Sequence, residues 1–108
     1  MQLKGLSASR GAGVGAAKIV LSAADLTKVQ QGDIMVVKHS NPAFATGLFK
    51  ASAVISENGG MLFHLAILAR EVGVPLVSGV ENACKIIDEG KVISVNATDE
   101  EGVVTLDD

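Results

Sequence analysis

The chain has 108 residues and a formal net charge of −3, and its 48% of apolar residues suffices for one domain with one hydrophobic core. Only 3% of the residues are aromatic and no basic cluster occurs, which argues against a nucleic-acid-binding groove. The single cysteine, Cys84, rules out an internal disulfide and a multi-thiolate metal site, so we expect no bound metal.

No apolar run is long enough to cross a bilayer, and no targeting segment opens the chain. We therefore expect no membrane association and a cytoplasmic location.

The first half of the chain predicts strands that alternate with short helices. Apolar runs rich in β-branched residues predict the strands, and Ser22, with Asp25 three residues later, predicts the start of a helix. Gly47 weakens the second helix by about 1 kcal/mol relative to alanine. The predicted elements are strands at residues 17–21, 33–37 and 53–56 and helices at residues 22–29 and 43–50.

The second half contains the strongest predicted helix, residues 62–72, which ends at Gly73 as a left-handed cap with Pro75 just beyond it. The other predicted elements are a strand at residues 75–78, a helix at 81–87 and strands at 92–95 and 103–106. Strand-helix-strand units mixed with strand pairs predict an α/β domain with helices packed on a sheet. Because no repeat or linker occurs, we expect residues 1–108 to form a single domain whose ends are the chain ends.

A glycine pair precedes the strongest helix. Gly59 and Gly60 allow close approach of the backbone to another group, and the start of the helix favours an anion. His64 lies in the first turn of this helix, where its imidazole can act as a nucleophile near neutral pH. These residues together are typical of a site that carries a phosphoryl group.

Two interpretations of His64 remain open from the residues alone. A single histidine in an apolar helix is more often a structural residue hydrogen-bonded to a carbonyl group. The glycine pair favours a functional role, but it is too short for a Walker phosphate loop or a dinucleotide fingerprint.

The wider motif resembles the swivelling phosphohistidine domain of phosphoenolpyruvate-utilising enzymes. This family includes phosphoenolpyruvate synthase, pyruvate phosphate dikinase, enzyme I of the sugar phosphotransferase system and rifampin phosphotransferase. The matching residues around the histidine are Gly59-Gly60, His64, Ala66-Ile67, Ala69-Arg70-Glu71, Gly73-Val74-Pro75 and Gly79. Further matching segments are residues 5–11, 32–36, 79–83 and 101–104, so the resemblance covers nearly the whole chain.

The resemblance implies a compact three-layer β/β/α swivelling phosphohistidine domain of the α/β class. It implies that His64 is transiently phosphorylated and that Gly59 and Gly60 shape the environment of the phosphate. The partners it implies are an ATP-binding (ATP-grasp-like) domain and a PEP/pyruvate-type or acceptor-binding domain, in the same chain or as separate subunits. Magnesium and ATP or PEP are expected on those partners, and this domain alone is not expected to turn over.

The sequence departs from the family beside the histidine. Members usually have a small hydroxyl or thiol residue just before it and often a threonine one place earlier, where this chain has Phe63 and Leu62. Leu65 replaces the usual small residue after it. We expect Phe63 and Leu65 to form an exposed apolar rim that docks on a partner, unless transfer has been lost.

Helical geometry separates the other charged residues from the phosphate. Arg70 is six residues past His64 and so lies about 120° around the helix, which favours a structural role. Glu71 is expected to be a solvated charge, and His39, beside Asn41-Pro42, is more typical of an exposed turn than of a site.

Three functional hypotheses follow. The first is a phosphoryl-carrier domain centred on His64, and the alternative is a non-catalytic interaction or regulatory module that keeps the fold. A weaker third hypothesis is a small-ligand-binding domain that uses the loop at Gly59-Gly60.

Overall fold

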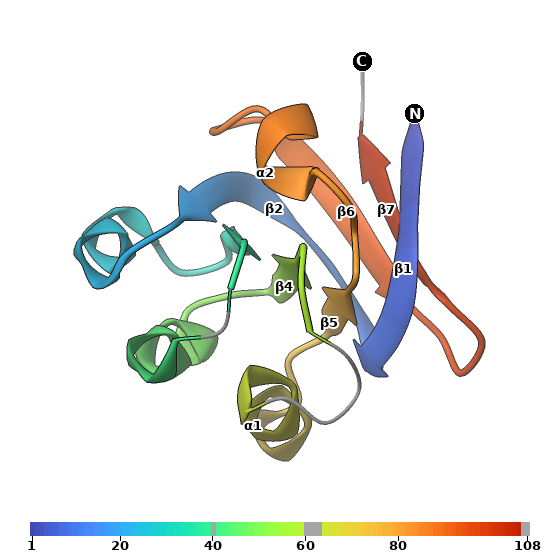
Figure 1. Ribbon diagram of the computed structural model, residues 1–108, viewed down its shortest axis with the longest axis horizontal. Coiled ribbons are helices and arrows are strands. Elements are labelled where there is room, and N and C mark those ends of the chain that lie inside the picture. Colours follow the sequence, from blue (N-terminus) through green and yellow to red (C-terminus); the bar gives the residue numbers. More distant parts are fainter. Residues whose placement is uncertain (40, 60–63, 107–108) are drawn as a thin grey trace.

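The computed structural model describes residues 1–39, 41–59 and 64–106 and combines seven strands with short helices in these ranges (Figure 1). The strands are β1 Gln2–Ser9, β2 Gly11–Val20, β3 Ile34–Val37, β4 Ala53–Ser56, β5 Leu76–Ser78, β6 Val92–Ala97 and β7 Gly102–Leu106. The 3₁₀ helices are η1 Ala23–Lys28 and η2 Pro42–Phe49, and the α-helices are α1 His64–Val72 and α2 Ala83–Ile86.

The strands close into a barrel in the order β1-β5-β4-β3-β2-β6-β7. Neighbours from β2 through β3 and β4 to β5 are parallel, whereas β1, β6 and β7 join the barrel through antiparallel pairs. In Figure 1, η1, η2 and α1 lie outside the parallel strands, on the side away from β6 and β7. Parallel strands need crossover connections, and these helices provide them.

Two hydrophobic cores lie on opposite faces of the parallel strands. On β3, Ile34 and Val36 belong to the inner core, which the antiparallel strands complete, whereas Met35 and Val37 belong to the outer core beneath the helices. This alternation follows from the two-residue period of a strand. All four β3 side chains are fully buried, which explains the continuous apolar run in the sequence.

The expected mixed α/β fold is confirmed, but an arrangement in three separate layers is not. Strands β1 and β2 each pair with strands on both sides of the inner core, so the two sheets are continuous with each other. The antiparallel strands and the parallel strands therefore form one closed wall around the inner core.

The predicted strands at residues 33–37, 53–56, 75–78, 92–95 and 103–106 all occur, with small differences at their ends. The prediction missed β1 and the first half of β2, which begins at Gly11 instead of Ala17. The missed segments are rich in glycine, alanine and serine, which have low strand propensity. Pairing of residues 11–16 with β6 makes them a strand despite this composition.

Two of these glycines are required by close backbone contacts. A Cβ atom on Gly15 would overlap the Gly32 carbonyl oxygen, and one on Gly5 would overlap the Ser78 carbonyl oxygen. A side chain at Gly5 would push β1 away from the end of β5, and one at Gly15 would push β2 away from the turn before β3. The glycines therefore allow the barrel to close.

The predicted helices occur in modified form. Segments 22–29 and 43–50 are 3₁₀ helices, and Asn41 begins the second by accepting a hydrogen bond from the Ala43 N–H at 2.9 Å. The helix at 81–87 shortens to Ala83–Ile86, and Gly73 ends α1 at φ +79°, as its predicted cap role requires. Within the described ranges, no helix is long and apolar enough to span a membrane.

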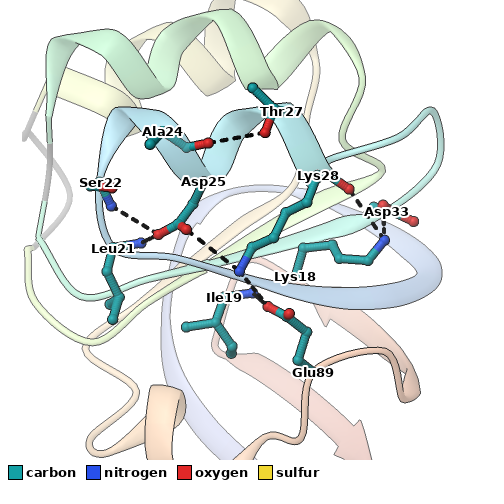
Figure 2. A network of polar contacts seen from close by, with 10 residues as sticks. All are labelled: Lys18, Ile19, Leu21, Ser22, Ala24, Asp25, Thr27, Lys28, Asp33 and Glu89. Atoms are coloured by element: carbon teal, nitrogen blue, oxygen red, sulfur yellow. Dashed lines mark hydrogen bonds and ion pairs between the residues drawn. The ribbon is translucent and has the colours of Figure 1, made fainter.

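A polar network fastens η1 to the barrel (Figure 2). Lys18 Nζ on β2 lies 2.7 Å from Asp33 Oδ2, which also accepts the Gln30 N–H at 2.8 Å. Burial alone would raise the pKa of Asp33, but the hydrogen bonds from Lys18 and Gln30 and the Lys18 charge outweigh it and lower the pKa. The Asp33 carboxylate is therefore favoured in the folded state.

The other half of the network joins η1 to the turn before β6. Lys28 Nζ lies 2.7 Å from Glu89 Oε1, which accepts the Ile19 N–H at 2.8 Å (Figure 2). These contacts lower the pKa of Glu89, with the Lys28 hydrogen bond as the largest cause. Asp25 caps the start of η1 by accepting the Leu21 N–H at 2.9 Å.

We predict that Lys18→Met lowers the free energy of unfolding by about 1–3 kcal/mol at pH 7, because it leaves the buried Asp33 carboxylate without its charged partner. The lowered pKa means that this contribution is complete above the unfolded-state pKa of about 3.9 and is lost as the pH falls through the folded-state pKa. Urea unfolding at pH 7 and in acid measures both effects.

Lys4→Met is the matched control, because the Lys4–Glu101 pair is 3.8 Å apart and both side chains are largely exposed. It should change the free energy of unfolding by less than about 0.5 kcal/mol. Equal losses in the two variants, or a Lys18→Met loss that persists in acid, would contradict the role given to Asp33.

Candidate functional site

The candidate site lies at the sheet edge where the parallel strands β3 and β4 end. These strands end at Val37 and Ser56, which are paired in register. Two residues beyond each strand end, Asn58 Nδ2 lies 3.1 Å from His39 Nδ1. The carboxyl edge of parallel strands is a common place for ligand-binding groups. The register of the sheet thus joins two polar side chains that are 19 residues apart in the sequence.

Hydrogen bonds hold the segment that follows β4. The Glu57 N–H donates to the Val37 carbonyl oxygen at 2.9 Å, and the Ser56 hydroxyl group donates to the Asn58 carbonyl oxygen. Gly59 has φ +106°, a conformation that side-chain-bearing residues rarely adopt. Gly60, the second glycine of the predicted phosphate environment, lies outside the described residues. The chain therefore turns at Gly59 toward α1.

His64 is exposed and is the first residue of α1. The helix is oriented by Leu65, Ala66 and Ala69, which are buried against the parallel strands. The first N–H groups of a helix have no partners within the helix, and its dipole favours negative charge at this end. The imidazole is thus accessible at a helix end that suits an anion, as the sequence predicted.

The predicted apolar rim beside His64 is wrong for Leu65. Leu65 is only 1% exposed and belongs to the outer core. Neighbouring helical residues point about 100° apart, so an outward His64 allows Leu65 to face inward. Phe63, the other residue of the predicted rim, lies outside the described residues. The exposed apolar residue one turn beyond His64 is Ile67, at 40%.

Arg70 is directed away from the candidate site. One of its guanidinium nitrogens donates to the Ala8 carbonyl oxygen on β1 at 2.6 Å. This contact joins the last turn of α1 to the barrel and also places a positive charge near the negative end of the helix dipole. It agrees with the structural role expected from helical geometry.

A cavity of about 500 Å³ surrounds Arg70 at the C-terminal end of α1, and its rim carries an ion pair of 2.7 Å between Arg10 and Asp99. Both arginines therefore have partners within the protein. The lining residues are Ser7, Ala8, Ser9, Arg10, Arg70, Gly73, Thr98 and Asp99.

Glu57 connects the candidate site to α2. Its Oε2 accepts the Cys84 N–H at 2.8 Å. Burial, together with the hydrogen bond and the negative charge of Glu57, raises the pKa of the half-buried Cys84 thiol to about 12, although the Lys38 charge opposes this rise. Cys84 is therefore protonated at physiological pH and is a structural residue.

In the part of the chain that the structure describes, no three histidine, cysteine, aspartate or glutamate side chains are grouped so that they could hold a metal ion. The arrangement instead offers an exposed imidazole, a helix N-terminus and the His39–Asn58 pair. These groups suit an anion that is attached to or held beside His64.

Sequence reasoning missed Glu57 and Asn58 and gave His39 little weight. All three follow the last residue of a parallel strand by one or two positions. Polar residues at these positions are the available signal, because strands in register carry their following residues to the same edge.

The sequence of this chain is similar to a known protein family and to curated proteins. A family model described as "PEP-utilising enzyme, mobile domain" matches residues 29–100, more than half of the chain. A probable phosphoenolpyruvate synthase from Archaeoglobus fulgidus is 39% identical over 102 residues, which are 94% of this chain and 13% of the relative. The chain therefore spans only a small part of such curated relatives.

Solved structures show the same fold at low sequence identity. The crystal structure of aconitase X from Thermococcus kodakaraensis matches with a TM-score of 0.73 at 18% identity, covering 100% of this chain and 99% of that chain. The solution structure of an Enzyme I protein matches with a TM-score of 0.61 at 20% identity, covering 77% of this chain and 34% of that chain.

We predict that Cys84 reacts about a thousandfold more slowly with iodoacetamide at pH 8 than a thiol of pKa 9.0, because only the thiolate reacts and its fraction is that much smaller. Mass spectrometry of the folded chain measures the rate, and the same chain in denaturant is the control. Glu57→Gln should raise the rate in the folded chain, because it removes the negative charge beside the thiol. Equal rates in folded and denatured protein would contradict this account of Cys84.

Proposed function

Because the chain belongs to the mobile-domain family of PEP-utilising enzymes, we propose that it is a phosphoryl-carrier domain in which His64 is transiently phosphorylated. The observation that carries the proposal is the exposed His64 at the N-terminus of α1, just after the glycine turn. A ring nitrogen of His64 attacks the phosphorus of the donor, and the bond from phosphorus to the leaving oxygen breaks. The reverse displacement at an acceptor restores the free imidazole.

The bulky Leu65 is compatible with this function. It replaces the usual small residue after the histidine, but its side chain fills the outer core and does not obstruct the exposed imidazole. The departure from the family at this position is therefore a change in packing beneath α1. It leaves the accessibility of His64 intact.

The proposed carrier acts together with other domains. We propose an ATP-binding (ATP-grasp-like) domain that charges His64 and a PEP/pyruvate-type or acceptor-binding domain that discharges it. Magnesium and ATP or PEP would be held by these partners. The small share of the relative that the chain covers supports partners within the same polypeptide, and separate subunits are the alternative arrangement.

Residues 1–108 would form one mobile unit that shuttles between these two sites, in the cytoplasm where ATP and PEP occur. The two cores on opposite faces of the parallel strands support a β/β/α layering of antiparallel strands, parallel strands and helices. A closed barrel stiffened in this way can move as a single body between its partners.

We predict that the chain, incubated with labelled PEP or ATP in an extract of cells that contain its partners, gains an acid-labile and base-stable phosphoryl label. His64→Ala should abolish the label, because it removes the nucleophile. Gel autoradiography after acid and base treatment measures both results.

Arg70→Met is the matched control. It should keep the label while lowering the free energy of unfolding by about 1–2 kcal/mol, because it removes the hydrogen bond to Ala8. The carrier function would be contradicted if the folded wild-type chain stays unlabelled under conditions in which a related domain is phosphorylated. That result would favour a non-catalytic interaction or regulatory module.

A further inference from the structure

We propose that His39 is a second imidazole of the site and that its Nε2 donates a hydrogen bond to the phosphoryl group carried on His64. This inference rests on the proposed carrier function. Three features of the described residues support it. His39 contacts Asn58, and the strands before these two residues end at the same edge of the sheet. Several other charged groups interact with partners elsewhere in the protein.

The Asn58 contact leaves one ring nitrogen of His39 available. Asn58 Nδ2 lies 3.1 Å from His39 Nδ1, so the amide donates to Nδ1 and the neutral ring then carries its proton on Nε2. When the ring is protonated, a half-turn of the amide presents Oδ1 as an acceptor for the Nδ1 proton. Asn58 can therefore hold the ring in both protonation states, and among the described residues no partner is seen for the Nε2–H donor.

The strands and helices bring His39 and His64 to the same edge. The helix η2 begins at Pro42, three residues after His39, and α1 begins at His64, six residues after Asn58. Both helices leave the carboxyl edge of the parallel strands and pack beside each other on the outer core (Figure 1). Both helices therefore follow the sheet edge that bears the His39–Asn58 pair.

Other charged groups around this edge are engaged elsewhere. Glu57 accepts the Cys84 N–H. Lys18 pairs with Asp33, and Arg70 contacts Ala8 near the other end of α1. A phosphoryl group carries nearly two negative charges near neutral pH, so a donor that can become positive stabilises it. Both imidazole protonation states of His39 supply such a donor.

His39 acts here without taking part in the covalent step. In the test reaction a ring nitrogen of His64 attacks the phosphorus of phosphoramidate, a phosphorus–nitrogen bond to His64 forms, and the bond to ammonia breaks. The departing ammonia takes a proton from the reagent. His39 keeps its proton and donates a hydrogen bond to a phosphoryl oxygen. It therefore affects the rate at which His64 is phosphorylated and the lifetime of the phosphorylated His64.

The experiment measures phosphorylation of the purified chain by phosphoramidate with ³¹P NMR from pH 5.5 to 8.5, followed by the decay of the product after the reagent is removed. We expect His39→Ala to slow phosphorylation and to speed decay by about tenfold each, as expected for loss of one hydrogen bond to a charged group.

His39→Gln is the conservative partner of His39→Ala, because its side-chain amide can also donate a hydrogen bond. It should restore part of the phosphorylation rate and of the product lifetime, which a merely structural role of His39 would not do. Thermal unfolding of each variant should match the wild type, since His39 is exposed.

The outcomes separate the two proposals. If the wild type is labelled on His64 and His39→Ala reacts and decays at the same rates, the role of His39 is overturned while the carrier function stands. If the label survives His64→Ala and disappears in His39→Ala, His39 is the residue that is phosphorylated. Both the role of His64 as carrier and the role of His39 as hydrogen-bond donor would then be overturned. A folded wild type that takes no label overturns the carrier function and this inference with it.

Discussion

Burial of both faces of three short parallel strands is the constraint on which the rest of the molecule depends. Antiparallel strands cover one face of β3, β4 and β5, and helices cover the other. A slip of one residue in register would exchange the side chains of the two cores, so the register is fixed. The loops after β3 and β4 therefore leave the sheet side by side, which brings His39 to Asn58.

The same constraint explains which helices and strands could be predicted from the sequence. Strands buried on both faces are continuous apolar runs, so β3 and β4 were predicted almost to the residue. The first half of β2 has no such run, and only its pairing with β6 makes it a strand. His64 and Gly59 were recognisable from local pattern, whereas the His39–Asn58 contact depends on strand register. Leu65 was misjudged because the family pattern does not reveal which way a neighbouring helical residue faces.

Several charged groups, including three cations that a phosphate site could use, contribute to holding the fold together. Arg70 fastens the far end of α1 to β1, and Glu57 fastens the loop after β4 to α2. Lys28 attaches η1 to Glu89, and Lys18 of β2 pairs with Asp33 before β3 (Figure 2). His64, by contrast, is exposed at the start of its helix. This division suits a domain that presents a nucleophile and meets the charges needed for catalysis on other surfaces.

The close contact at Gly5 has an evolutionary consequence. Residues 5–11 resemble the family, and Gly5 on β1 is required there by its close contact with the Ser78 carbonyl oxygen. A descendant that abandoned phosphoryl transfer would still need this glycine to close its barrel. The opening segment therefore records common ancestry and shape, and it would persist in an inactive relative. The proposed carrier function depends instead on residues at the strand ends and at the start of α1, such as His64.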